Sequence, residues 1–422
     1  MPAHIFVLGL DALNLETLRH LEPDEFTFHE LLPKDELIGI ENIDLAGLLD
    51  RAAQQLEAFD GPIDAIVGYW DFPVSSMLPI LCRRFGVPGP PLDAVVKCEH
   101  KYWSRIEQRK VIEEVPEFAL VDLDEHEGLP PNLRYPVWLK PVKSVSSELA
   151  FRVGDRDELN AALTEMRQGI DKYGEPFEFV LGQLDLPPEI ARVGATACLA
   201  EEAAVGQQVT VEGYSVGGEV HVYGIVDSLT YPDTSSFLRY QYPSQLPERI
   251  RARLAEISQK VVEQLGLDSI TFNIEYFWDP DNDRIRLLEV NPRHSQSHAL
   301  LFEHVDGVSN HEAMIKLALG RTPRRPAGEG PYDVAAKCYL RAFDDGVVVR
   351  SPSRAEVERI EQELDGVTVR VVAETGSRLS DLAQQDSYSY ELAQVFVGAR
   401  DEAELIETYE RCVQMLAFEI QN

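Results

Sequence analysis

The sequence has no excess of basic residues: 72 acidic side chains outnumber 39 basic ones, which gives a formal net charge of −33 at pH 7. Nucleic acids and anionic membranes bind proteins through positively charged surfaces, so we expect neither as a partner. A polyanionic ligand would need a local basic pocket within this acidic chain. Lysines and arginines inside acidic stretches are therefore the informative cations.

Long apolar runs and a cysteine framework are missing as well. No stretch approaches about 18 consecutive apolar residues, and the opening MPAHIFVLGLD has no basic segment before its apolar one, so we expect neither a membrane span nor a signal peptide. The five cysteines are scattered and form no C-x-x-C pair, which favours buried thiols in a reducing compartment over disulfides or a zinc site. These absences predict a cytoplasmic protein.

No Walker-type phosphate loop, internal repeat or low-complexity segment is present either. A chain of 422 residues with 44% hydrophobic content has room for about two to four domains. We predict a mixed α/β and α+β architecture in three parts. These are an N-terminal α/β domain over residues 1–95, a middle domain over 96–322 and a C-terminal α+β covering domain over 323–422.

The N-terminal part alternates apolar strands with amphipathic helices. Apolar runs predict strands at 4–9 and 63–68, and apolar periodicity predicts helices at 45–59 and 74–85. This order favours a small parallel sheet. The Pro/Gly segment GVPGPPLDAV that follows is either a domain boundary or an ordinary loop.

Two lysines stand out in the next stretch. A helix predicted over 96–111 carries Lys101, which taken alone we expect to be a solvent-exposed helix lysine. Lys140 ends the strand WLKP, before the polar loop KSVSS. Small side chains there would let backbone N–H groups approach a phosphate, and a plain hairpin turn is the alternative. Asp155, with Glu158 three residues later, is expected to cap a helix.

The middle of the chain predicts an antiparallel sheet. TACLAEE is an apolar strand that ends in Glu201 and Glu202, and the alternating GQQVTVEGYSVGGEVHVYGIVDS turns at its paired glycines. An amphipathic helix over 249–265 is expected to stop at Gly266.

The Pro/Gly/Arg segment 321–331 is the clearest predicted boundary. Beyond it, strand patterns alternate with helical patterns at 353–364 and 401–418. We interpret this part as a compact module that covers a site or forms an interface.

The most informative stretch is residues 268–298, DSITFNIEYFWDPDNDRIRLLEVNPRHSQSH. It predicts a hairpin that turns at DPDND, in which Glu275 faces Glu289 and Asn273 faces Asn291. The opposite, buried face would carry Phe272, Ile274, Tyr276, Leu288 and Val290.

Two facing carboxylates repel each other, so a sheet would not select them for stability. A hard divalent cation removes the repulsion, because Mg²⁺ prefers carboxylate and amide oxygens and keeps phosphate oxygens as further ligands. Arg293 follows at once, with a planar guanidinium suited to a phosphate or carboxylate. The alternative is a solvent-facing strand pair in another register.

The order of these parts resembles the ATP-grasp superfamily of carboxylate ligases. The resemblance rests on GVPGP, the helix with Lys101, WLKP, AEEAAVG, TVEGYSVGGEV, FNIEYF and LLEVNPRHSQSHAL. It covers roughly residues 1–320, and Glu-x-Asn-Pro-Arg after a partner Glu is its most specific motif. It implies an ATP-grasp fold with a mobile lid at about 136–204 over a central antiparallel sheet.

The resemblance also implies roles for individual residues. The nucleotide would be bound by Lys101 and Lys140 at the phosphates and by Glu201, Glu202, Val205 and Gln208 at the base and ribose. Mg²⁺ or Mn²⁺ would be held by Glu275, Glu289 and Asn291. Arg293 would be catalytic and steady the transferred phosphoryl group and the acyl phosphate. Gln208 occupies a position where the family usually has a ribose-binding Glu.

The implied reaction activates a small carboxylic acid, with amino acids among the candidates, as an acyl phosphate that an amine attacks. A small carboxylate and an amine are then the expected partners, and a homodimer is an open alternative to a monomer. A carboxyphosphate-forming enzyme like biotin carboxylase is one alternative, but Ser295 and Ser297 replace the Gln and Glu that serve bicarbonate there. A catalytically silent ATP-binding protein is another. We interpret His294 and His298 as packing or surface residues.

Overall fold

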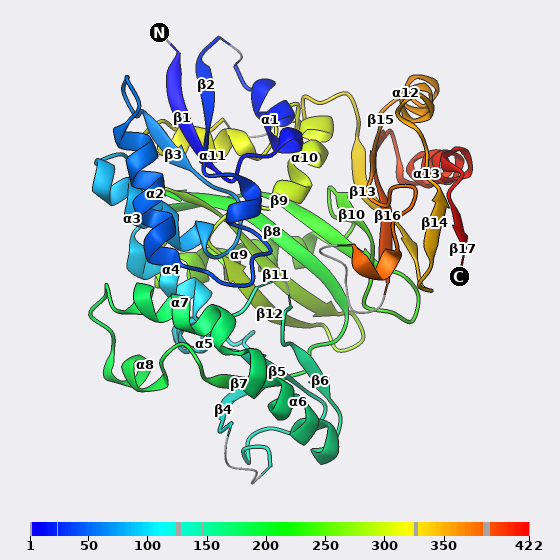
Figure 1. The fold of residues 1–422 in the computed structure, drawn as a ribbon. Helices are drawn as coiled ribbons and strands as arrows, with labels where there is room; N and C mark the ends of the chain where they lie inside the picture. The colour runs from blue at the N-terminus through cyan, green and yellow to red at the C-terminus, as the bar shows by residue number, and fades with distance from the viewer. Residues whose placement is uncertain are drawn as a thin grey trace.

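The computed structural model describes residues 2–22, 24–123, 128–145, 147–324, 328–382 and 389–421. Figure 1 shows an N-terminal layer, a small lid below it, a long central sheet and a C-terminal module at the right. None of the helices in these ranges is both long and apolar enough to cross a membrane. Parts of the predicted KSVSS loop and of the segment 321–331 lie outside the described residues.

The N-terminal layer contains a three-stranded parallel sheet in the order β2-β1-β3, as the alternating pattern predicts. Its strands are β1 (Ala3–Leu8), β2 (Phe26–Leu31) and β3 (Ala65–Val67). The helices around it are α1 (Ala12–Arg19), α2 (Leu45–Glu57) and α3 (Val74–Phe85). Gly86 ends α3 in the left-handed region, at φ 66°, which glycine adopts without strain.

The prediction of one helix over 96–111 is wrong, because the chain forms two separate helices in this region. α4 (Leu92–Glu99) and α5 (Lys101–Gln108) meet at His100, whose extended backbone interrupts the helical hydrogen bonds. The His100 ring accepts the N–H of Trp103 at 3.2 Å and so caps α5. The backbone N–H of Lys101 is thereby free to donate to the carbonyl of Val142 at 2.8 Å.

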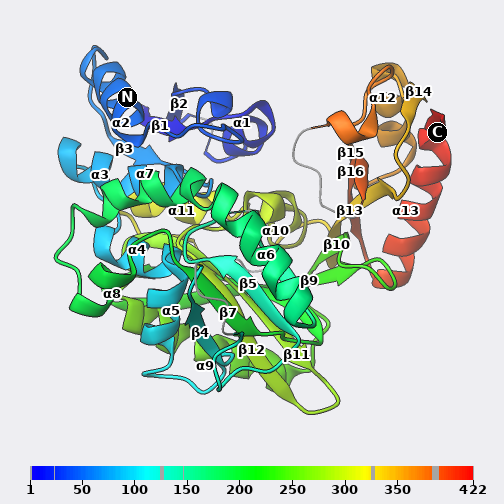
Figure 2. The ribbon, with the colours of Figure 1, turned by 60° about the horizontal axis from the view of Figure 1, so that its bottom comes forward.

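The lid is a four-stranded antiparallel sheet in the order β4-β7-β5-β6. Its strands are β4 (Phe118–Val121), β5 (Val137–Pro141), β6 (Phe151–Val153) and β7 (Cys198–Glu202). Its first strand therefore precedes the predicted start of the lid. α6 (Arg156–Gly169) packs on the lid sheet, with Asp155 as the predicted N-cap. Figure 2 views the molecule from the lid side.

Two further helices tie the lid region to the N-terminal layer. They are α7 (Asp171–Leu181) and α8 (Pro188–Val193). Phe177 of α7 is fully buried, and its ring packs edge-on against Phe72 with 5.7 Å between centroids. Apolar burial thus fixes this part of the lid region to the body of the molecule.

The central sheet has eight strands in the order β12-β11-β8-β9-β10-β13-β16-β15. Its first five are β8 (Gln207–Val216), β9 (Glu219–Thr230), β10 (Phe237–Tyr242), β11 (Ile270–Asp279) and β12 (Arg284–Asn291). α9 (Glu248–Leu265) packs apolar side chains against one face, and Gly266 ends it as predicted. The other face carries the predicted carboxylates. Two short helices follow β12, α10 (Ala299–Asp306) and α11 (His311–Ala318).

The C-terminal module continues the same sheet, which the sequence did not indicate. The added strands are β13 (Val334–Ala342), β15 (Val367–Val371) and β16 (Tyr390–Ala399), and β10 pairs directly with β13. The helices are α12 (Arg354–Glu363) and α13 (Glu402–Leu416), close to their predicted ranges, and β14 (Val347–Arg350) pairs with β17 (Glu419–Gln421). Because the sheet is continuous, the division into three domains stays a proposal.

The five cysteines are buried and unpaired, as predicted. They are Cys82, Cys98, Cys198, Cys338 and Cys412.

Candidate active site

The hairpin of β11 and β12 places the predicted carboxylates face to face. Glu275 pairs with Glu289 and Asn273 with Asn291, so the predicted register is confirmed at these positions. A bulge then shifts the register, and Tyr276 faces Leu287.

The bulge overturns one prediction for the buried face. Leu287 is fully buried, whereas the predicted core residue Leu288 is only partly buried. The extra residue of the bulge turns the Leu288 carbonyl toward Arg105, whose guanidinium donates to it at 2.5 Å. The bulge therefore holds the Arg105 guanidinium next to the facing carboxylates.

The two facing carboxylates have different partners. Glu275 accepts hydrogen bonds from the amides of Gln208, at 2.9 Å, and Asn291, at 3.4 Å. Burial and the facing Glu289 raise the pKa of Glu275 to about 7. Glu289 instead forms an ion pair with Lys101 at 2.5 Å. Burial opposes its charge, but nearby lysines, Lys101 first, hold its pKa below the usual value.

These residues fit a hard divalent cation. Two carboxylates and the amide oxygen of Asn291 are oxygen donors of the kind that Mg²⁺ and Mn²⁺ accept. Burial and then the facing Glu289 raise the pKa of Glu275, and a bound divalent cation would offset both effects. Within the described ranges, no group of three or more His, Cys, Asp or Glu side chains forms a complete metal cage. The remaining ligands would come from a substrate, as is usual for Mg²⁺ bound with nucleotide phosphates.

Lys101 is not a solvated helix lysine. Its side chain is 12% exposed, and besides Glu289 its ammonium group donates to the carbonyl of Ser144 at 3.3 Å. Ser144 belongs to the polar loop after β5, so Lys101 links the lid to Glu289, a predicted metal ligand.

Lys140 and Glu201 lie together in a buried ion-pair cluster. Glu201 is 3% exposed and accepts from Lys140 at 2.5 Å and from Arg105 at 2.7 Å. Although burial alone would raise it, these two cations lower the pKa of Glu201 to about 2. Burial lowers the pKa of Lys140, which marks its ammonium group as incompletely compensated. The predicted nucleotide contacts of both residues stay predictions.

Three other predicted nucleotide residues surround the end of β7. Glu202 pairs with Arg284 at 3.1 Å, and Gln208 holds Glu275. β7 ends at Glu202, as the pattern TACLAEE predicts, so Val205 lies in the connection to β8 and is 66% exposed. The chain turns at Gly206, where a Cβ would lie 2.1 Å from the Trp278 carbonyl oxygen.

Arg293 is held by a residue that the sequence did not indicate. Both oxygens of Asp71 accept from its guanidinium, each at 2.7 Å. Asp71 lies in the loop YWDFP of the N-terminal layer. The Arg293 carbonyl accepts from Asn273 at 2.9 Å, which fixes the backbone beside the facing carboxylates. Only a long-range contact brings Asp71 to the site.

Lys143 and Glu99 form a second buried pair that the sequence analysis missed, at 2.9 Å. The Glu99 carboxylate also accepts from Ser76 of α3 at 2.9 Å. Lys143 adds a third ammonium group that lowers the pKa of Glu289, after Lys101 and Lys140. These three lysines form a local cluster of cations in a chain of net charge −33, as a polyanion would require.

The two histidines of the motif are buried and partnered, in agreement with a packing role. His294 bonds to Thr271 at 3.1 Å and to His311 at 2.8 Å, and burial lowers its pKa well below the usual value. His298 bonds to Glu212 at 2.7 Å.

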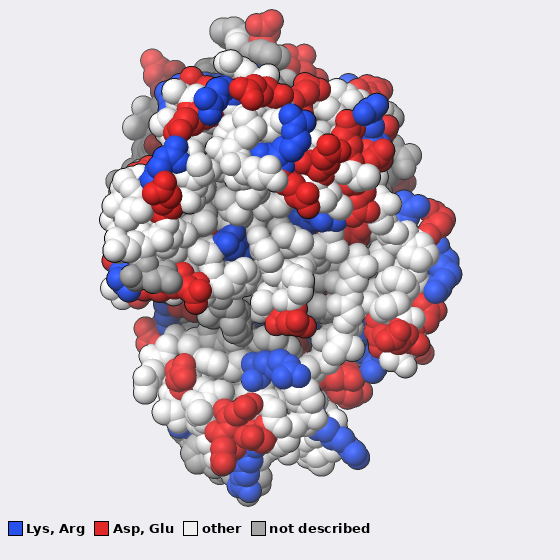
Figure 3. Space-filling model, turned by 90° about the vertical axis from the view of Figure 1, so that its right-hand side faces the viewer, with Lys and Arg blue, Asp and Glu red and all other residues white. Residues whose placement is uncertain are grey.

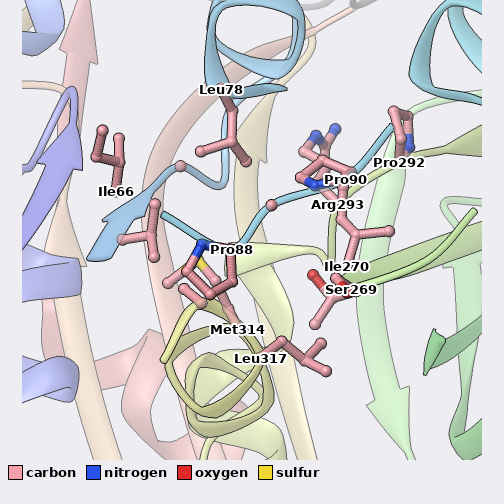
Figure 4. A pocket seen from close by; sticks show the side chains of 15 residues that line it. Ile66, Leu78, Pro88, Pro90, Ser269, Ile270, Pro292, Arg293, Met314 and Leu317 are labelled. Carbon is pink, nitrogen blue, oxygen red and sulfur yellow. The ribbon is translucent and has the colours of Figure 1, made fainter. Parts of the chain in front are cut away.

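A small pocket lies beside the base of Arg293. Figure 4 shows mainly apolar side chains around it, from Pro88 and Pro90 in the segment after α3 to Met314 and Leu317 of α11. The facing carboxylates do not line it. Figure 3 shows that the centre of the face on the C-terminal side is hollowed and mostly uncharged, with acidic and basic side chains around it.

Comparison with known proteins shows which fold the chain has. Residues 133–299 match the family model of the ATP-grasp domain. The solved structure of an L-amino acid ligase from Bacillus licheniformis aligns with 100% of this chain and 99% of its own, at TM-score 0.75 and 17% identity. A biotin carboxylase from Campylobacter jejuni aligns with 100% of this chain and 92% of its own, at TM-score 0.68 and 17% identity. The chain thus has the ATP-grasp fold, and the resemblance is confirmed.

Among curated proteins, the carbamoyl phosphate synthase large chain of Archaeoglobus fulgidus is 25% identical over 277 residues, which are 64% of this chain and 23% of the relative. The chain spans less than a quarter of the length of these curated relatives.

Proposed function

We propose that this chain is an ATP-dependent ligase that activates a small carboxylic acid as an acyl phosphate for attack by an amine. The single observation that carries the proposal is the facing pair of Glu275 and Glu289, joined to Lys101 on one side and neighboured by Arg293 on the other. A carboxylate and the γ-phosphate of ATP are both anionic, so the site must neutralise both before they react.

The residues suit the first half-reaction. Lys101, Lys140 and Lys143 supply positive charge where the phosphates would lie, and Glu275, Glu289 and Asn291 would hold Mg²⁺, which supplies charge neutralisation and phosphate orientation when bound. A carboxylate oxygen of the acid attacks the γ-phosphorus, the bond to the ADP oxygen breaks, and ADP leaves. Arg293, held by Asp71, would donate to the transferred group.

In the second half-reaction the amine nitrogen attacks the acyl carbon. The bond from that carbon to the phosphate oxygen breaks, and inorganic phosphate leaves with the proton that the amine loses. An acyl phosphate hydrolyses in water, so the lid sheet over the site would have to exclude solvent. The Lys101 contact to Ser144 connects the charge of the site to that lid.

The direct test measures ADP and phosphate release with ATP, Mg²⁺ and pooled small carboxylic acids, with and without pooled amines. Release that requires both pools is the expected result. A parallel reaction with bicarbonate and biotin tests the carboxylase alternative, and activity confined to that reaction would overturn the proposal. ATP binding without release under any condition would favour a catalytically silent protein.

A further inference from the structure

Among the residues that the structure describes, one buried cation near the site forms no ion pair with a carboxylate within 4.0 Å. Among the described residues, the buried lysines and arginines are Arg105, Lys140, Lys143 and Lys337. The first three pair with carboxylates at 2.5 to 2.9 Å. Lys337 of β13 is 5% exposed, and no carboxylate of a described residue lies within 4.0 Å of its ammonium group. An unpaired buried charge is costly, so its retention needs a reason.

The sheet register places Lys337 on the face that carries the candidate site. Lys337 pairs with Tyr240, Tyr240 with Ser228, and Ser228 with Gln208, whose amide holds Glu275. Residues in direct register point to the same face. Three strand spacings of about 4.8 Å put Lys337 roughly 14 Å from Gln208 along the sheet. The side chains of Lys337 and Gln208 extend into this interval, so a small substrate between them would bring its non-reacting end, and not its reacting carboxylate, to Lys337.

The immediate partner of Lys337 belongs to the motif after Arg293. Its ammonium group donates to the hydroxyl of Ser297 at 3.2 Å, and it lies over the rings of Tyr339, at 5.1 Å, and Phe396, at 5.6 Å. A hydroxyl and two ring faces orient the ammonium group but do not neutralise it. Burial, opposed by the negative charge of Glu391 and helped by the positive charges of Arg341 and Lys34, lowers the pKa of Lys337 to about 8. An anion would relieve this cost.

We propose that Lys337 binds a second, non-reacting carboxylate of a substrate, so that the site accepts either an amino acid as the amine or a dicarboxylic acid as the acid. The proposal rests on the proposed ligase function and names its substrate class. Ser297 would complete the subsite by orienting the ammonium group. Bringing that carboxylate to Lys337 would leave the reacting end of the substrate beside Glu275 and Arg293.

The test measures binding by calorimetry in the presence of ADP and Mg²⁺, so that it does not depend on turnover. One arm compares the twenty standard L-amino acids with their carboxamides, and the other compares succinate and glutarate with their monoamides. We expect at least one free carboxylate to bind more than about tenfold tighter than its amide, because the amide cannot pair with the ammonium group. The arm that shows the preference identifies the substrate that carries the carboxylate.

The variant Lys337→Met keeps the length of the side chain and its packing on the two rings but removes the charge. We expect it to lose the preference, to bind ADP as wild type does and to keep or raise the Tm, because an unpaired buried charge is gone. Lys316→Met is the matched control, since Lys316 pairs with Glu22 outside the site. It should keep the preference.

Three results would overturn the inference: no preference in either arm, a preference that persists in Lys337→Met, or a lower Tm that marks Lys337 as a structural partner of Glu391. If the protein is an active ligase but Lys337→Met still prefers the free carboxylate, only the inference about Lys337 is refuted. Carboxylate binding without any ADP release would refute the ligase proposal alone.

Discussion

Arg293 and Asp71 form a two-point ion pair across 222 residues of sequence, with each donor to acceptor distance 2.7 Å. Burial of Arg293 disfavours its charge, but Asp71 reverses this and raises the pKa of the guanidinium. The pair joins the N-terminal layer to the strand end that carries the facing carboxylates. Arg293 is thus held in one orientation before any substrate arrives.

Removing Asp71 should slow the reaction without weakening ATP binding. In Asp71→Asn the guanidinium loses its charged partner and samples other orientations, and we expect kcat to fall by about 10- to 100-fold. The KM for ATP should stay within about twofold, because the phosphates are bound by the lysines. Steady-state kinetics of ADP release measure kcat and the KM for ATP separately and so check this prediction. A change in KM alone would mean that Asp71 only shapes the nucleotide site.

Glu275→Gln should stabilise the metal-free protein, but only at high pH. The folded pKa of Glu275, about 7, lies above its usual 4.5, so the folded state holds an extra proton between these values and loses stability as the pH rises through them. Glutamine removes the repulsion, and we expect the Tm in EDTA to rise by roughly 1–3 °C at pH 8 and to be unchanged at pH 5. Thermal unfolding at both pH values checks this. An equal shift at both would refute the assigned pKa.

Glu289→Gln should have the opposite effect on stability. Glu289 pairs with Lys101 at 2.5 Å, and its loss leaves that partly buried ammonium group without its carboxylate. We expect a lower Tm than wild type at pH 8 in EDTA. The two variants are each other's control, because both remove one charge from the same facing pair. Effects of the same sign would contradict the unequal roles of the two carboxylates.

Glu201→Gln should destabilise the fold strongly. It leaves Arg105 and Lys140 buried with one neutral partner, and breaking such a cluster costs about 3–5 kcal/mol. Glu202→Gln is the matched control, since Glu202 is 33% exposed and its pair with Arg284 is worth about 1 kcal/mol or less. Urea unfolding of the two variants measures the difference. Equal losses would show that Glu201 is not the centre of the cluster.

Local pattern was enough to predict much of the fold. Alternation and the DPDND turn predicted the pairing of Glu275 with Glu289, because the side-chain period of a strand is two and the turn fixes the register. Helix ends at Gly86 and Gly266 followed from the left-handed conformation that glycine favours. The bulge at Leu288 was not predicted, since it depends on a contact of the Leu288 carbonyl with Arg105.

The site residues that the sequence analysis did not identify form contacts with residues far away in the sequence. Asp71 reaches Arg293, Glu99 reaches Lys143 and Lys337 reaches Ser297 only after the layers have packed. A helical spacing of four from Lys101 could have pointed to Arg105, because such residues lie on one face of a helix. No local signal distinguishes Asp71 from the many other acidic residues of this chain.

The central claim is that the facing carboxylates form the metal end of an ATP site. Mg²⁺ binding in the presence of ADP, measured by calorimetry for wild type, Glu289→Gln and the control Glu202→Gln, tests it most directly. Glu202→Gln isolates the metal contribution, because Glu202 is a predicted nucleotide residue that is not a predicted metal ligand. We predict that wild type binds Mg²⁺ with ADP, that Glu202→Gln keeps the Mg²⁺ affinity at saturating ADP, and that Glu289→Gln stays folded but binds Mg²⁺ at least about tenfold more weakly and releases no ADP from ATP. Wild-type Mg²⁺ affinity and turnover in Glu289→Gln would contradict the claim.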